Sequence, residues 1–172
     1  MRIVDFRIVR FQFARDRVIG DSQVRIAHAH VATLELIADN GMVGLGFVPS
    51  LFNPLPSQAE IERLFRAEIW PGLEGQSPAA LAHKLTRPRG GNIRGASLPF
   101  GEGLDQALWD LAAKQVGMPL WKLLGGTKSR VKAYASGLDF HLSDDDFCAL
   151  FDHAASIGYK SFKIKVGHPD IE

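Results

Sequence analysis

The sequence has almost no cysteine, no excess of one charge and no long apolar run. Cys148 is its single cysteine, so these residues cannot form an internal disulfide, and such low cysteine use is typical of a reducing compartment. Twenty basic and nineteen acidic side chains leave a formal net charge of +1. This near balance excludes a global electrostatic attraction to nucleic acid or to an anionic membrane.

The first residues, MRIVDFRIVRFQF, carry a charged side chain every few positions. A signal peptide or a membrane-spanning helix needs an uninterrupted apolar run, so neither fits here. We therefore expect a cytoplasmic, soluble protein that binds a small molecule and not nucleic acid or a membrane.

The beginning of the chain has the composition of β-strands. Ile3–Phe13 and Val24–Ala38 are rich in β-branched and aromatic residues. Asp39-Asn40-Gly41 predicts a tight turn that joins the second strand to a third over residues 42–48. The polar stretch Ala14–Gln23 between the first two strands predicts a loop.

The middle of the chain predicts helices. Ser57 followed by Glu60 is typical of a helix start with a capping box. Apolar spacing predicts two further helices near residues 78–85 and 104–115. The intervening stretch, Arg87–Gly103, is basic and glycine-rich and predicts a long loop.

A β-α-β unit is expected after residue 128. VKAYASG (131–137) and SFKIKVG (161–167) predict strands, and Ser143 predicts the start of a helix whose first turn holds three aspartates. Such a unit is normally parallel. A barrel of eight units needs about 250 residues, so we expect the sequence to be the front part of a longer protein.

Two lysines, Lys163 and Lys165, alternate with Phe162, Ile164 and Val166 in the last predicted strand. Alternation places both lysines on one face, about 7 Å apart at Cα. Inside a barrel they would lie near the carboxyl ends of the strands, where catalytic groups sit. Neighbouring ammonium groups disfavour each other's protonation, so one lysine could act as a general base. The pattern alone also fits an edge strand with solvated lysines, because strands that are apolar on one face and charged on the other are common.

A family resemblance is carried by ALWDLAAKQVGMPLWKLLGG, residues 107–126. It resembles the end of the amino-terminal capping domain in the mandelate racemase and muconate-lactonising branch of the enolase superfamily. The strand, helix and K-x-K strand that follow, VKAYASG, SDDDFCALFDHAASIG and FKIKVG, have that family's order and spacing. The resemblance implies an α+β capping domain (antiparallel sheet plus helical bundle) over 1–127, and the first units of a (β/α) TIM-type barrel over 128–172.

The resemblance also implies a reaction. Members abstract the proton next to a substrate carboxylate and form an enediolate held by Mg²⁺. By motif position, Lys165 resembles the base, and Lys163 resembles the neighbour that keeps it deprotonated and lies near the substrate carboxylate. Ser136 resembles a serine that hydrogen-bonds the substrate.

Two predicted loops resemble the capping-domain loops that close over the barrel mouth, Ala14–Gln23 and Phe47–Pro56. Loops of this kind select the substrate and exclude water. The candidate lid residues are Arg15, Arg17, Ile19 and Phe52.

The resemblance implies metal ligands that this sequence does not contain. In the family they are an aspartate and two glutamates on the next barrel strands, which would follow Glu172. No metal ligand is therefore assigned, and residues 1–172 alone are expected neither to bind Mg²⁺ nor to turn over substrate.

Several functions remain open at this point. A sugar-acid dehydratase is favoured, because the arginine-containing first loop suits a polyhydroxylated acid. The protein is also expected to form a homo-oligomer. A 2-hydroxy-acid racemase or epimerase is the alternative within the superfamily. A lyase that forms a Schiff base on Lys165 and a non-catalytic capping or scaffold module are alternatives outside it.

Three further patterns are interpreted as structural. His28 and His30 could supply half of a metal site, but no third ligand is near them in the sequence. Gly44-Leu45-Gly46 lacks the third glycine of a dinucleotide fingerprint, so these glycines are expected to let the lid loop approach closely. The arginines of the 87–103 loop are expected to be solvated or to contact a neighbouring subunit.

Overall fold

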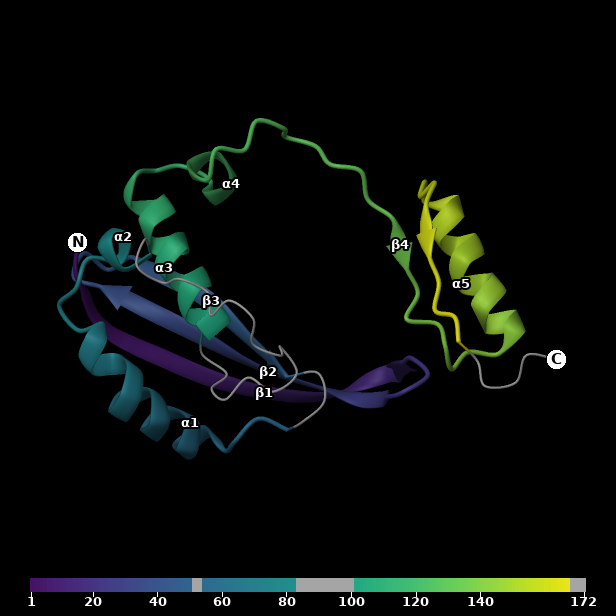
Figure 1. Ribbon diagram of the computed structural model, residues 1–172, viewed down its shortest axis with the longest axis horizontal. Helices are drawn as coiled ribbons and strands as arrows, with labels where there is room; N and C mark the ends of the chain where they lie inside the picture. Colours follow the sequence, from purple (N-terminus) through teal and green to yellow (C-terminus); the bar gives the residue numbers. More distant parts are fainter. Residues whose placement is uncertain (51–53, 83–100, 168–172) are drawn as a thin grey trace. The chain divides into compact units, whose positions relative to one another are not determined.

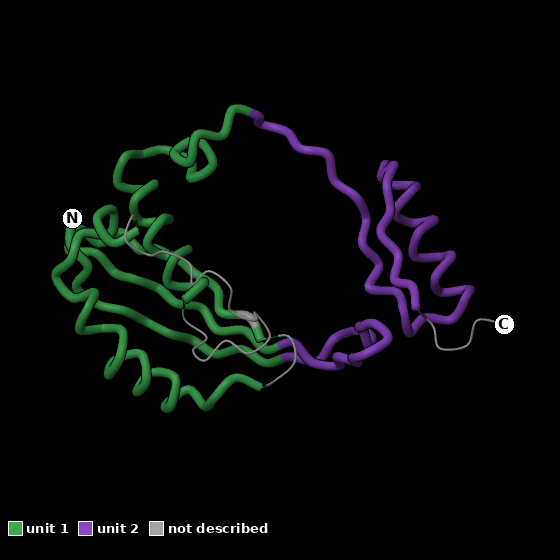
Figure 2. Tube along the Cα trace, in the orientation of Figure 1, with its two compact units in different colours: residues 1–12, 30–127 green, residues 13–29, 128–172 purple. Residues whose placement is uncertain are grey.

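The computed structural model describes residues 1–50, 54–82 and 101–167 (Figure 1). The chain divides into two compact units (Figure 2). The first comprises Met1–Gln12 and His30–Thr127, and the second comprises Phe13–Ala29 and Lys128–Glu172. The hairpin formed by the first two strands thus contributes its base to the first unit and its tip to the second.

A three-stranded sheet in the order β1-β2-β3 forms the base of the first unit. Its strands are β1 (Ile3–Gly20), β2 (Arg25–Ala38) and β3 (Val43–Ser50). β2 and β3 pair antiparallel, with His30 opposite Ser50 and Ile37 opposite Val43. Gly41 has a φ of +80° in the turn, where glycine is favoured, and donates its N–H to the Ala38 carbonyl at 2.9 Å. The predicted hairpin turn is confirmed.

The loop predicted over Ala14–Gln23 is wrong, because β1 continues to Gly20 and β2 begins at Arg25. Only a short turn separates them, in which Asp21 donates its N–H to the Val24 carbonyl at 3.1 Å. The charged side chains of this stretch resemble a loop in sequence. A hairpin strand tolerates them, because an antiparallel ribbon can be solvated on one face.

Helix α1 (Gln58–Leu64) begins as predicted at Ser57, whose hydroxyl accepts the N–H of Glu60 at 3.3 Å. The Glu60 carboxylate accepts hydrogen bonds from Arg63, and this lowers the pKa of Glu60. The remaining helical elements of the first unit are a π-helical turn (Phe65–Ile69), a 3-10 turn (Trp70–Gly72), α2 (Pro78–Ala82), α3 (Gly101–Gln115) and α4 (Leu120–Leu123).

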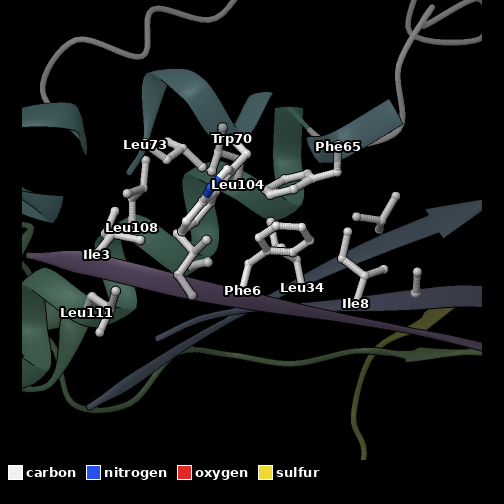
Figure 3. Packing of buried hydrophobic residues seen from close by; sticks show 14 of the residues in the cluster. Ile3, Phe6, Ile8, Leu34, Phe65, Trp70, Leu73, Leu104, Leu108 and Leu111 are labelled. Carbon is white, nitrogen blue, oxygen red and sulfur yellow. The ribbon is translucent and has the colours of Figure 1, made fainter. Parts of the chain in front are cut away.

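One continuous core joins the sheet to these helices (Figure 3). Phe6 of β1 packs against Phe65 and Trp70, with ring centroids 4.6 and 5.0 Å apart. Alternate residues of β2 and one face of α3 complete it: Ala32, Leu34, Leu36 and Ala38, with Leu104, Leu108 and Leu111. Each fully buried leucine contributes about 1.5–3 kcal/mol. This cluster is therefore the main source of stability in the first unit.

Helix α3 crosses β3 at two glycines. A Cβ on Gly44 would overlap the carbonyl oxygen of Ala107, and one on Gly46 would overlap that of Gly103. The close approach lets Asp110 accept the backbone N–H of Leu45 at 2.9 Å, and Gln106 accept that of Phe47 at 3.1 Å. These glycines therefore admit α3, and the expectation that they serve a lid loop is wrong.

The second unit contains the predicted β-α-β segment. β4 (Ala135–Ser136) and β5 (Phe162–Lys163) pair parallel, with Ser136 opposite Lys163. α5 (Asp144–Ser156) begins at Ser143, whose hydroxyl accepts the N–H of Asp146 at 3.2 Å. Both strands are shorter than the predicted strands 131–137 and 161–167, because β4 and β5 pair with each other over only two residues.

Within residues 1–50, 54–82 and 101–167, every helix is too short or too polar to cross a membrane.

Candidate active site

The parallel pairing in the second unit brings predicted site residues together. Ser136 of β4 lies opposite Lys163 of β5, and paired residues of adjacent strands share a face of the sheet. Lys165 follows two positions later, at the carboxyl end of the strand pair. This is the end at which barrel enzymes carry their catalytic groups.

The tip of the β1–β2 hairpin is bound to the segment that follows Ser136. The Arg17 guanidinium donates to the carbonyl oxygens of Gly137 at 2.5 Å and Leu138 at 3.3 Å. Just before β2, on the other side of the hairpin turn, the carbonyl oxygen of Val24 lies 3.2 Å from a His141 ring nitrogen. These contacts fasten the hairpin tip beside the end of β4.

Replacing Arg17 with alanine is expected to loosen the hairpin tip. A hydrogen bond from a charged group contributes about 1.5–3 kcal/mol, and partial exposure places Arg17 at the lower end of that range. We expect amide exchange across residues 13–29 to accelerate about tenfold, as measured by hydrogen-deuterium exchange mass spectrometry of the full-length protein. Arg25→Ala is the matched control, because Arg25 is an exposed arginine of the same hairpin. Equal exchange in the two variants would contradict the proposed attachment.

A carboxylate of the hairpin turn faces the candidate base. The Lys165 Nζ lies 4.0 Å from Oδ2 of Asp21, and both side chains are partly exposed. The other oxygen of Asp21 accepts the N–H of Gln23 at 3.0 Å, which fixes the carboxylate in the turn. A long, partly solvated ion pair contributes little to stability. The pair nevertheless places the negative charge of Asp21 near the Lys165 amine.

The other candidate lid residues occupy different environments. Ile19 is buried, at 8% exposure, near the end of β1. Arg15 is half-buried in the same strand, and Ser136 is exposed. Phe52 lies outside the described residues, as do the arginines of the 87–103 loop. Where sequence reasoning predicted a lid loop, the structure thus has two paired strands and a short turn.

Asp139 is a residue of this region that sequence reasoning missed. Its side chain is buried, and its Oδ2 accepts the backbone N–H of Lys165 at 3.3 Å. The signal available in the sequence was an acidic residue two positions after the predicted barrel strand 131–137, at the edge where functional groups gather.

The described residues do not form a metal centre. No group of three or more histidine, cysteine, aspartate or glutamate side chains comes together in residues 1–50, 54–82 and 101–167.

A shallow hollow of about 370 Å³ is present elsewhere in the second unit, lined by Arg17, Leu142, Asp146 and Leu150. Its lining includes neither lysine of the K-x-K pair. We therefore do not place the reacting part of a substrate there.

Comparison with known proteins identifies the family. Residues 17–125 match the profile described as "Mandelate racemase / muconate lactonizing enzyme, N-terminal domain". A D-gluconate/D-galactonate dehydratase of Picrophilus torridus is 31% identical over 138 residues, which are 77% of this chain and 34% of that protein. An arabinonate dehydratase of Saccharolobus solfataricus is 37% identical over 82 residues, 46% of this chain and 22% of that protein.

Solved structures of related proteins also resemble this chain. A protein from Mesorhizobium loti, provisionally described as a mandelate racemase, is 61% identical with a TM-score of 0.90, covering 99% of this chain and 44% of its own. A racemase from Streptomyces coelicolor A3(2) with bound magnesium shares the fold, with a TM-score of 0.77 at 24% identity, over 98% of this chain and 48% of its own. The chain thus spans less than half the length of these relatives. It belongs to the mandelate racemase and muconate lactonizing enzyme family.

Proposed function

We propose that this chain is the amino-terminal part of an acid-sugar dehydratase of the enolase superfamily. The observation that carries the proposal is its similarity, over 77% of its length, to a D-gluconate/D-galactonate dehydratase. A second similarity, to an arabinonate dehydratase, supports the same substrate class. Residues 1–127 would be the capping domain, and residues 128–172 the start of the barrel.

Lys165 would be the base of this reaction. Its amine would take the proton from the carbon next to the substrate carboxylate. The hydroxyl on the following carbon would then leave, with a proton, as water, and the resulting enol would tautomerise to a 2-keto-3-deoxy acid. Position at the carboxyl end of the β4–β5 pair supports this role.

The neighbouring residues would bind and enclose the substrate. Lys163 would lie near the substrate carboxylate, and the exposed Ser136 hydroxyl beside it would donate a hydrogen bond to the substrate. Arg17 and Ile19 would act through the hairpin tip, Arg17 by anchoring it to the carbonyls after Ser136. Phe52 would contribute from the second capping loop. Enclosure by such segments excludes water from the reacting groups.

Mg²⁺ would be the cofactor, as bound magnesium in a racemase of the same fold suggests. Since the described part of this chain brings no set of three ligands together, its ligands would come from elsewhere in the enzyme. The complete enzyme would be a cytoplasmic homo-oligomer. An exposed, unpaired Cys148 fits a reducing compartment.

A panel of aldonic acids incubated with the full-length enzyme and Mg²⁺ tests the proposed function. We expect at least one acid to yield a 2-keto-3-deoxy product, detected as its semicarbazone. An enzyme that dehydrates no acid but exchanges the proton next to a carboxylate with solvent would be a racemase or epimerase instead. That second function is favoured by the 61% identity to the Mesorhizobium loti protein. A substrate adduct on Lys165 trapped by borohydride would favour the Schiff-base alternative.

A further inference from the structure

Asp139 has a buried carboxylate that packing alone does not explain. Its residue is 4% exposed, which is unusual for a residue that carries a charge. Oδ2 accepts the Lys165 N–H at 3.3 Å. Oδ1 is buried and has no hydrogen-bond partner among the residues described. Buried carboxylate oxygens are normally fully bonded, so an incompletely bonded one points to a function.

The backbone holds this carboxylate in one place. The Asp139 carbonyl accepts the N–H of Leu142 at 3.0 Å, which closes a turn before α5. Leu138, the preceding residue, has a φ of +49°, a left-handed conformation that is uncommon for leucine. Its carbonyl and that of Gly137 are the acceptors of Arg17. Asp139 therefore sits in a turn that is fixed from both sides.

The β4–β5 ladder ends before Lys165. Its last pair joins Ser136 to Lys163, and Lys165 lies two residues beyond β5. The ladder therefore supplies no main-chain acceptor on β4 for the Lys165 N–H. The Asp139 side chain supplies the acceptor in its place.

We propose that Asp139 is a positioning residue for Lys165. By accepting the Lys165 N–H, the Asp139 carboxylate fixes the backbone position of Lys165, two residues beyond the last β4–β5 pair. The proposal rests on the proposed role of Lys165 as the base. A general base must be held within hydrogen-bonding reach of the proton that it removes, and misplacement by about 1 Å can lower the rate about 10²-fold.

The test uses three variants of the full-length enzyme. Asp139→Ala removes the acceptor, and Asp139→Asn keeps a carbonyl oxygen of the same reach without the charge. Ser143→Ala is the matched control, since it removes the cap of α5 in the same unit without touching Lys165. Steady-state kcat and KM on the best aldonic acid are measured, together with amide exchange of the peptide that contains Lys165.

We expect Asp139→Ala to lower kcat about 10²-fold, with KM changed less than threefold and faster exchange at Lys165. Asp139→Asn should restore kcat to within about threefold of wild type, and Ser143→Ala should leave kcat and the Lys165 exchange unchanged. The proposal is overturned if Asp139→Ala keeps wild-type kcat, if Asp139→Asn is as slow as Asp139→Ala, or if Ser143→Ala slows the enzyme equally.

Amide exchange separates this proposal from the proposed function. If Asp139→Ala accelerates exchange at Lys165 but Lys165→Ala proves fully active, the hydrogen bond exists and Lys165 is not the base. If Lys165→Ala is inactive while Asp139→Ala changes neither exchange nor kcat, the base assignment stands and the positioning role is wrong.

Discussion

Lys165→Ala in the full-length enzyme is expected to lower kcat for dehydration by about 10²–10⁴-fold, the contribution usual for a general base. The amine would be the group that accepts the substrate proton, and alanine offers no replacement at that position. KM should change far less, because Lys163 and Ser136 would still bind the substrate. Initial rates of 2-keto product formation across a range of substrate concentrations measure both constants.

Two companion variants make this expectation specific. Lys165→Arg keeps the positive charge, but a guanidinium stays protonated and cannot serve as a base, so it should be as inactive as alanine. Lys160→Ala removes an exposed lysine of the same β-α-β segment and should retain wild-type kcat. A Lys165→Arg enzyme with near wild-type activity would mean that the residue acts only through its charge.

Gly46→Ala is expected to be the most damaging small substitution in the first unit. The added methyl group would overlap the Gly103 carbonyl of α3, which is backbone and cannot rotate away. α3 would have to move off β3, which disturbs the hydrogen bonds that Gln106 and Asp110 accept from the strand. Overpacking of this kind lowers the free energy of unfolding by about 1–3 kcal/mol, and we expect the upper end because the blocking atom is backbone.

Gly72→Ala provides the control for this loss of stability. A Cβ at Gly72 would have no atom within 4 Å, and its φ lies outside the left-handed region that favours glycine. Urea unfolding of the full-length variants should therefore show a large loss for Gly46→Ala and almost none for Gly72→Ala. Equal stability of the two variants would show that the α3–β3 contact is not needed in the folded protein.

Local sequence patterns predicted much of the fold correctly. The Gly41 turn and the Ser57 and Ser143 helix starts all depend on residues close together in sequence. These features follow from capping, turn chemistry and alternation, which act over a few residues. They were therefore predictable without knowledge of the distant parts of the chain.

The features that sequence reasoning missed depend on distant partners. The polar stretch Ala14–Gln23 predicts a loop, but its Arg17 binds carbonyl oxygens more than 100 positions later. The proposed role of Asp139 depends on its hydrogen bond to the backbone of Lys165, 26 positions away. Gly44 and Gly46 were expected to let the lid loop approach closely, because a strand pattern gives no sign of the crossing with α3. Tertiary contact decided each of these cases.

A crystal structure of the full-length enzyme with Mg²⁺ and a slowly reacting aldonic acid tests the central claim most directly. We predict that the Lys165 Nζ lies about 3–3.5 Å from the carbon next to the carboxylate, on the side of its hydrogen. The Ser136 hydroxyl should contact the same substrate. A bound acid with the Lys165 amine directed into bulk water, away from that carbon, would contradict the account.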